Sequence, residues 1–237
     1  MTSPDRHAVR STSGAVTVVP VTAPVELARV HARLLAPSFP PAELVSTGEL
    51  TAAVRAGTTE VLVLREDGEP AAVAVGERSR SAPVVLLSYL AADASRRSAG
   101  LGGRLLDAAV ERWVQRSGPC VVLAEVEDPA HHRGSAAHGD PAARLRFYAR
   151  RGARALELPY FQPALRPGVP RVPHLLLVVL HAAPALVEGT ALQGALVHRF
   201  LTELLTAAEG SLPGDPEGRA LLAAVDPAGV VPTRALG

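Results

Sequence analysis

The chain has 237 residues, of which 48% are hydrophobic, and its 24 basic residues nearly balance its 23 acidic residues. This balance, together with only 3% aromatic residues, gives no electrostatic or base-stacking case for a nucleic-acid partner. The chain lacks lysine, which excludes lysine Schiff-base catalysis and P-loop nucleotide binding, and its one cysteine, Cys120, excludes a disulfide framework within the chain.

The sequence shows no membrane or export signal. Its longest apolar run, over 174–183, has the length of a strand rather than the roughly 18 residues of a membrane span, and the first 14 residues lack the apolar core of a signal peptide. We therefore expect a cytoplasmic protein with no membrane partner. Asparagine, isoleucine and lysine are all absent. Because their codons are AT-rich, a bacterial source with a GC-rich genome is favoured.

The pattern of the N-terminal half predicts strands and helices after a disordered lead-in over 1–14. Asp67-Gly68 between two strand-like runs is a strong hairpin signal, and Pro40-Pro41 separates two helical segments. The predicted elements are a strand over 15–21, helices over 25–35 and 41–55, two hairpin strands over 60–77 and a strand over 82–92.

The C-terminal half alternates helices and strands. Asp140-Pro141 supplies an N-cap and a first-turn proline for a helix that stops at Gly152. The predicted elements are a helix to about Gln115, a strand over 120–128, the helix over 142–152, strands over 153–158 and 173–182, an amphipathic helix with an apolar stripe from Leu192 to Leu205, and a short helix over about 216–225. This order predicts a mixed α/β domain.

The turn between the strand over 82–92 and the next helix combines glycines with arginines. Glycines let a backbone approach an anion closely, and the amides of a first helical turn have no partners within the helix. The arginines add charge that a phosphate would neutralise, while the glycine spacing differs from the dinucleotide-binding fingerprint. The alternative is an ordinary strand–helix connection with a solvated basic face. The residues concerned are Arg96, Arg97, Gly100, Gly102, Gly103 and Arg104.

The segment RSAGLG, from Arg97 to Gly102, resembles the Arg/Gln-x-x-Gly-x-Gly/Ala signature of the GNAT acetyltransferase superfamily. The segment FYARRG, from Phe147 to Gly152, resembles the Phe-Tyr-x-x-x-Gly helix of that family. The resemblance covers about residues 15–181 and implies a GNAT-like acyl-CoA N-acyltransferase fold, an α/β (α+β) fold with a mixed sheet. A helical C-terminal extension with a Gly/Pro-rich tail, over 182–237, lies outside it.

The resemblance also implies where acetyl-CoA binds. The glycine–arginine turn would hold the pyrophosphate through the residues Arg96, Arg97, Ser98, Ala99, Gly100, Leu101, Gly102, Gly103 and Arg104. In the family the fourth and fifth strands separate at their C-terminal ends and the thioester lies between them. The backbone of Leu90, Ala91 and Ala92 would then pair with the pantetheine arm, and an N–H near Ala92 would hold the oxyanion.

Two carboxylates follow apolar residues on one face of the strand over 120–128. Period-two alternation places Val121, Leu123, Glu125 and Glu127 on that face. A partly buried carboxylate can take the proton that an ammonium must lose before it attacks. Glu125, which lies deeper in the strand, is the first candidate for this base and Glu127 the second. The alternative for each is a solvated charge at the strand end.

The resemblance assigns Tyr148 the protonation of the departing CoA thiolate; the alternative is a core tyrosine whose hydroxyl bonds to backbone. Two positions depart from the family pattern. Asp140-Pro141 replaces the asparagine often found at the start of this helix, and Ala153 replaces the usual aromatic residue after Gly152. Both departures concern the positioning of the CoA arm.

The remaining candidates are weaker. His131, His132 and His138 match no zinc spacing, so we expect no metal site and favour a loop that is solvated or faces substrate. The loops over 128–140 and 159–173 and the first two helices are expected to line the acceptor site, and their basic and histidine groups favour an acceptor with a carboxylate or phosphate. Three roles are open to the C-terminal amphipathic helix: to cover the core, to form a homodimer contact or to close over substrate. The first two are favoured, because such apolar stripes usually mark packing.

Together these features predict an N-acetyltransferase that moves an acetyl group from acetyl-CoA to a primary amine of a small molecule or peptide by direct attack. Two alternatives stay open. One is a GNAT-fold module that binds CoA with little catalysis, which the two departures favour slightly. The other is an acyltransferase that uses another acyl-CoA or a hydroxyl acceptor.

Overall fold

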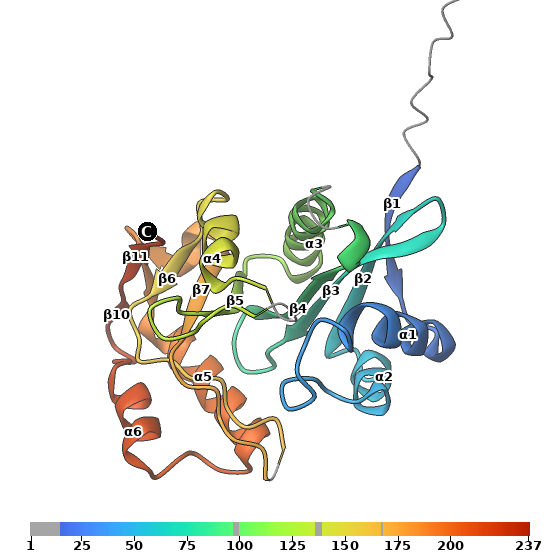
Figure 1. The fold of residues 1–237 in the computed structure, drawn as a ribbon. Helices are drawn as coiled ribbons and strands as arrows, with labels where there is room; N and C mark the ends of the chain where they lie inside the picture. The colour runs from blue at the N-terminus through green and yellow to red at the C-terminus, as the bar shows by residue number, and fades with distance from the viewer. Residues whose placement is uncertain (1–14, 97–99, 136–138, 167) are drawn as a thin grey trace, which may run out of the picture.

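A computed structural model describes residues 15–96, 100–135, 139–166 and 168–237 (Figure 1). The predictions for the lead-in over 1–14, and for Arg97, Ser98, Ala99 and His138, lie outside these residues. In the described part, a large twisted sheet runs through the molecule, with helices on both of its faces (Figure 1).

The main sheet has eight strands in the order β1-β2-β3-β4-β5-β7-β6-β11. All neighbours pair antiparallel except β4 and β5, which are parallel. Three short strands, β8, β9 and β10, form a second sheet. The strands are β1 (Val16–Val21), β2 (Thr59–Glu66), β3 (Glu69–Arg78), β4 (Val84–Ala92), β5 (Val121–Glu127), β6 (Arg154–Leu156), β7 (Leu175–Ala182), β8 (Val187–Glu188), β9 (Ala191–Gln193), β10 (Val230–Val231) and β11 (Thr233–Ala235).

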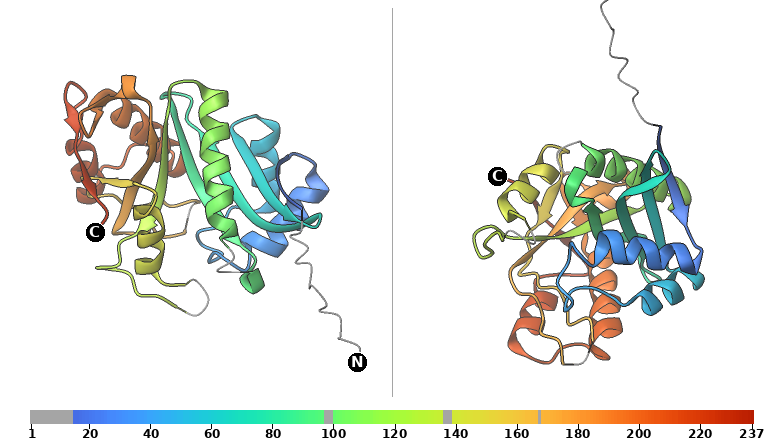
Figure 2. Two further views of the ribbon diagram at one scale, coloured as in Figure 1. Left: turned by 90° about the horizontal axis from the view of Figure 1, so that it is seen from above. Right: turned by 45° about the vertical axis from the view of Figure 1, so that its right-hand side comes forward.

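The helices divide between the two faces. Helix α3 lies over β2, β3 and β4, and α4 continues the same layer (Figure 2). Helices α1 and α2 cover the opposite face near β1, and α5 and α6 cover it at the far end (Figure 1). The helices are α1 (Pro24–Val30), which continues as the π-helical turn η1 (His31–Leu35), α2 (Thr47–Arg55), α3 (Leu101–Ser117), α4 (Pro141–Ala149), α5 (Gly194–Glu209) and α6 (Pro216–Ala223), with 3₁₀ turns η2 (Ala94–Arg96) and η3 (Pro184–Leu186).

Close packing between α3 and the sheet requires a glycine. Trp113 of α3 is fully buried, and a Cβ at Gly76 of β3 would overlap its indole ring. Cys120 is also fully buried and packs as a small apolar side chain. The same apolar cluster contains Leu105, Leu106 and Ala109 of α3, so the helix is held against the sheet along its length.

Strands β4 and β5 pair only over their first halves. Their ladder runs from Val84↔Val121 to Leu87↔Ala124, and beyond it each strand is held by its outer neighbour, β3 or β7. Near the point of separation, the β3–β4 register shifts past Ser88, a β-bulge that bends β4. The expected separation of these two strands is confirmed.

Several predicted boundaries were wrong. The helix expected over 41–55 begins only at Thr47, because Ser46 and Glu49 form a capping box at that point. The strand expected over 153–158 is restricted to β6. The region over 182–237 holds four further short strands, and one of them, β11, joins the main sheet beside β6. Strands of two or three residues are too short to show the alternation that identifies a strand.

Candidate active site

A cavity of about 450 Å³ opens where β4 and β5 separate. It is closed on its other sides by the segment before α2, by α4 and by the segment between β6 and β7. Six residues singled out in the sequence line it: Leu90, Ala91, Ala92, Glu125, Glu127 and Tyr148. The strand end, both carboxylates and the tyrosine are therefore brought to one site.

Glu125 is held inside this cavity by two side-chain donors. The Tyr160 hydroxyl donates to Glu125 Oε1 over 2.6 Å, and Gln162 Nε2 donates to Oε2 over 2.9 Å. Burial raises the pKa of the Glu125 carboxyl; the two hydrogen bonds lower it, and the nearby carboxylates of Glu77 and Glu43 raise it again. The net direction is upward, which gives Glu125 a higher proton affinity than an exposed glutamate has.

Glu127 has a different environment at the rim. Arg144 Nη1 lies 2.7 Å from Glu127 Oε2, and His132 Nδ1 lies 3.8 Å from Oε1. Glu125 is thus held by two uncharged donors within the cavity, whereas Glu127 is engaged by a guanidinium at its rim.

Tyr148 lies on α4 and faces the cavity with a side chain that is 5% exposed. Burial raises its pKa to about 12, although the charges of Arg144 and Arg151 act in the opposite direction. The hydroxyl thus keeps its proton at neutral pH. The start of α4 is as expected, since Asp140 Oδ1 accepts from the Ala142 amide over 2.9 Å and Pro141 opens the first turn.

The glycine turn lies at the N-terminus of the 17-residue helix α3. Gly100 is the N-cap residue with φ of 74°, a left-handed conformation that favours glycine. Among the residues that the structure describes, no atom lies within 4 Å of a Cβ built at Gly100 or Gly102, so they leave the backbone there open to an approaching group. Gly103 is different, because a Cβ at this buried position would overlap the Arg151 guanidinium.

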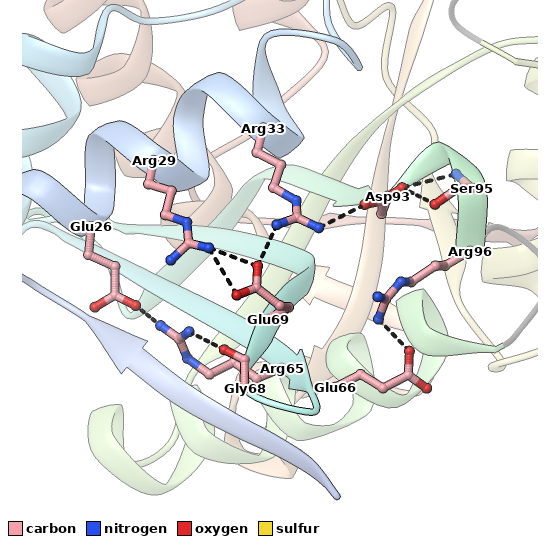
Figure 3. Close-up of polar contacts among 10 residues, drawn as sticks. All are labelled: Glu26, Arg29, Arg33, Arg65, Glu66, Gly68, Glu69, Asp93, Ser95 and Arg96. Carbon is pink, nitrogen blue, oxygen red and sulfur yellow. Dashed lines mark hydrogen bonds and ion pairs between the residues drawn. The ribbon is translucent and has the colours of Figure 1, made fainter. Parts of the chain in front are cut away.

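Ion pairs surround the end of β4, just before this turn (Figure 3). Asp93 Oδ1 accepts from the Ser95 amide and hydroxyl, which shapes the 3₁₀ turn η2. Arg96 Nη1 lies 2.5 Å from Glu66 Oε2, and Arg33 bridges Glu69 and Asp93 (Figure 3). The expected phosphate ligand Arg96 is thus in an ion pair, at the edge of the turn. Arg104 is exposed, and no ion pair of its side chain occurs within the described residues.

Sequence reasoning missed Tyr160 and Gln162. They lie in the segment between β6 and β7, among the prolines Pro159 and Pro163, where the sequence pattern indicates only a proline-rich connection. The spacing of two residues was an available signal, because it places both side chains on the same side of an extended chain.

Two further cavity residues were also missed. The Tyr89 hydroxyl donates to the Glu43 carbonyl over 3.0 Å and accepts from the Val45 amide over 3.1 Å, which fixes the segment before α2 against β4. Glu43 lines the cavity beside Tyr89. The pairing of residues about 45 positions apart has no signal in a single sequence.

The histidines of the loop after β5 make local contacts. His131 stacks on His174 with 4.1 Å between the ring centroids, and His132 Nε2 lies 2.8 Å from the Pro173 carbonyl. Within the described ranges, no group of three or more His, Cys, Asp or Glu residues is arranged to hold a metal ion. Among the helices of the same ranges, none is long and apolar enough to cross a membrane.

Comparison with known proteins identifies the fold. No protein-family model and no curated protein matches the sequence. A solved structure from Bacteroides thetaiotaomicron, assigned to the GNAT acetyltransferases, is 23% identical with a TM-score of 0.56, and the match covers 71% of this chain and 89% of that one. A GNAT-assigned structure from Desulfovibrio desulfuricans is 20% identical with a TM-score of 0.51, over 70% and 97% of the two chains. The chain therefore has the GNAT fold, which confirms the fold implied by the resemblance and the mixed α/β class expected from the order of the elements.

Proposed function

We propose that the protein is an acetyl-CoA-dependent N-acetyltransferase that acetylates a primary amine of a small molecule or peptide by direct attack. The observation that carries the proposal is the cavity at the separation of β4 and β5, which is lined by a buried carboxylate, a protonated tyrosine and a strand edge. The GNAT fold supports an acetyltransferase in general terms.

The residues present fit acetyl-CoA. Beyond Leu87, β4 has no β5 partner in its ladder, so the backbone of Leu90, Ala91 and Ala92 can pair with an extended amide-containing arm. At the end of this edge, the open backbone of Gly100 and Gly102 and the first-turn amides of α3 favour an anion. Acetyl-CoA, when bound, supplies the thioester carbonyl that the amine attacks.

The cavity side chains then have separate tasks. Glu125 takes one proton from the substrate ammonium, directly or through a water, and frees its nitrogen lone pair. A backbone N–H near Ala92 stabilises the negative charge that develops on the attacked oxygen. As the N–C bond forms and the C–S bond breaks, Tyr148 donates its proton to the leaving sulfur. The attacking nitrogen loses its second proton to give the amide, Tyr148 regains a proton from that nitrogen or from solvent, and Glu125 releases its proton to solvent.

The lining of the cavity favours a cationic acceptor. Among the described residues, it contains the carboxylates of Glu43, Glu125, Glu127 and Asp140 against one guanidinium, that of Arg144, which is paired with Glu127. Arg166, one of the basic residues expected to attract a carboxylate or phosphate, is engaged elsewhere, because it donates to the carbonyls of Pro41 and Leu44. An ammonium is the group that this lining attracts.

The test combines binding with turnover. Calorimetry with acetyl-CoA measures binding, and a thiol-release assay over a panel of amines measures transfer. We expect binding in both wild type and Glu125→Gln, and thiol release that falls at least about a hundredfold in Glu125→Gln and Tyr148→Phe. Absence of binding would refute the proposal. Binding without thiol release on any amine would instead favour a CoA-binding module.

A further inference from the structure

The segment over 159–173, between β6 and β7, is folded back on itself. Gln162 and Val172 form an antiparallel bridge with two backbone hydrogen bonds, of 2.9 and 3.0 Å, and the Leu175 amide donates to the Tyr160 carbonyl over 3.2 Å. These bonds set the backbone positions from which Tyr160 and Gln162 reach Glu125. The placement of the Glu125 carboxylate thus depends on how this segment is held.

Arg171, next to this bridge, joins the segment to the C-terminal helices. Its guanidinium donates to both oxygens of Glu209 over 2.7 and 2.6 Å, and to both oxygens of Asp215 over 2.9 Å each. A third carboxylate, that of Glu217, lies 3.3 Å from Nη1. The guanidinium also stacks over the Phe161 ring, 4.5 Å from its centroid. One arginine therefore bonds across the chain to the last residue of α5 and to the N-cap of α6.

This arrangement differs from an ordinary surface ion pair. The Arg171 and Glu209 side chains are only 20% and 16% exposed, and two carboxylates are each bound through a planar fork. The hydrogen bonds from Arg171 are the main reason that the pKa values of Glu209 and Asp215 are lowered. Bidentate, partly buried pairs hold their geometry, whereas isolated exposed pairs contribute little.

We infer that Arg171 is a positioning residue, which fastens the segment over 159–173 to α5 and α6 so that Tyr160 and Gln162 hold the Glu125 carboxylate in its working position. The inference rests on the proposed function for the role of Glu125. It gives the C-terminal region a part in the reaction that neither covering the core nor pairing two subunits would provide.

The charges around Glu125 make it sensitive to this segment. Glu77 of β3 and Glu43 of the segment before α2 both raise the pKa of Glu125. The Tyr89 hydroxyl of β4 is uncharged and bonds to backbone. The opposing contributions come from Tyr160 and Gln162, both in the fastened segment. Burial is the largest cause that raises this pKa, so loss of the two hydrogen bonds moves the pKa of Glu125 further upward as long as the carboxyl stays buried.

The test follows the protonation of Glu125 by NMR on glutamate-labelled protein, with Glu125→Gln identifying the signal, alongside the pH profile of thiol release. We expect Arg171→Gln to raise the pKa of Glu125 and the acid limb of kcat/KM by about 0.5 to 1 pH unit, since part of two hydrogen bonds to a carboxylate is lost. The turnover number should fall while the KM for acetyl-CoA stays unchanged. Arg171→Lys keeps the positive charge but lacks the planar guanidinium, so its pKa of Glu125 should lie between the values of wild type and Arg171→Gln.

The control is Glu203→Gln, because Glu203 fastens α5 to the turn over 79–81 and leaves the Arg171 contacts intact. It should lower stability without moving the pKa of Glu125. If Arg171→Gln does not fold, Glu209→Gln leaves Asp215 to hold Arg171 and serves as the milder variant. In the background of Tyr160→Phe, the pKa shift of Glu125 caused by Arg171→Gln should be smaller, because both substitutions act through the Tyr160–Glu125 hydrogen bond.

An unchanged pKa of Glu125 in Arg171→Gln, or an equal shift in Glu203→Gln, would overturn the inference. The NMR titration does not need turnover, so the two proposals fail separately. If the wild-type protein releases no thiol, the proposed function is refuted. If the wild type is active but Arg171→Gln leaves the pKa of Glu125 unchanged, only the role of Arg171 is refuted.

Discussion

Removal of one hydroxyl, in Tyr160→Phe, tests the proposed base directly. The hydroxyl donates to Glu125 Oε1 over 2.6 Å and is one of two side-chain donors to that carboxylate. Phenylalanine keeps the ring in its buried position, since Tyr160 is only 3% exposed. The substitution therefore changes the charge environment of Glu125 with little change in packing.

The expected shift follows from the strength of that bond. A hydrogen bond to a charged group contributes about 1.5 to 3 kcal/mol, and one pKa unit corresponds to about 1.4 kcal/mol. Loss of the donor destabilises the carboxylate and not the neutral acid, so the pKa of Glu125 rises. Because Glu125 must be ionised to accept a proton, the acid limb of kcat/KM should move to higher pH by about one to two units.

The assay is thiol release against pH, with two amines of different pKa to show that the acid limb belongs to the enzyme. Tyr89→Phe is the matched control, because it removes a tyrosine hydroxyl from the same cavity that bonds only to the backbone of Glu43 and Val45. Its acid limb should stay at the wild-type position. A Tyr160→Phe limb that coincides with wild type, or moves to lower pH, would refute the reasoning.

Three further predictions concern the anion turn, acid stability and backbone packing. Gly100→Val places a β-branched residue at a backbone φ of 74°, so we expect the KM for acetyl-CoA to rise about tenfold while the circular dichroism spectrum stays unchanged. An unaltered KM would contradict the role of the turn. Burial would raise the pKa of Glu203, but donors in the turn over 79–81 lower it from 4.5 to about 2. Its stabilisation of about 3 kcal/mol is therefore present above about pH 4.5 and is lost as the pH falls toward 2. Urea unfolding of wild type and Glu203→Gln should accordingly differ at pH 7 and converge in acid, and a constant difference would disprove this. Gly194→Ala would push a methyl group into the Asp226 carbonyl oxygen, which should lower the free energy of unfolding in urea by about 1 to 3 kcal/mol. An unchanged free energy of unfolding would show that this contact can relax.

Local patterns predicted most of the fold, because the signals for strands, hairpins and helix ends lie within a few residues. The alternation from Val121 to Glu127 holds in β5, where Val121 and Leu123 pack on one apolar cluster and Val122 on another. The same alternation predicts that Glu125 and Glu127 share one face of the strand, and both line the cavity.

What local patterns could not predict was the set of partners. Glu125 meets Tyr160 across 35 positions, and Arg171 meets Glu209 across 38. Such pairs are set by how the sheet and the C-terminal helices pack, and neither partner carries a mark of the other in a single sequence. The same holds for β11, whose place beside β6 depends on pairing across about 80 positions.

The short β4–β5 ladder has a mechanical consequence. Four residue pairs join β1–β4 to the rest of the main sheet, so the two halves meet at a narrow seam. A co-substrate that pairs along the free edge of Leu90 to Ala92 would act as a removable ninth strand and tie the halves together. Binding should then slow amide hydrogen exchange on both sides of the seam and raise the unfolding temperature of the whole sheet, because ligation of the native state alone stabilises it.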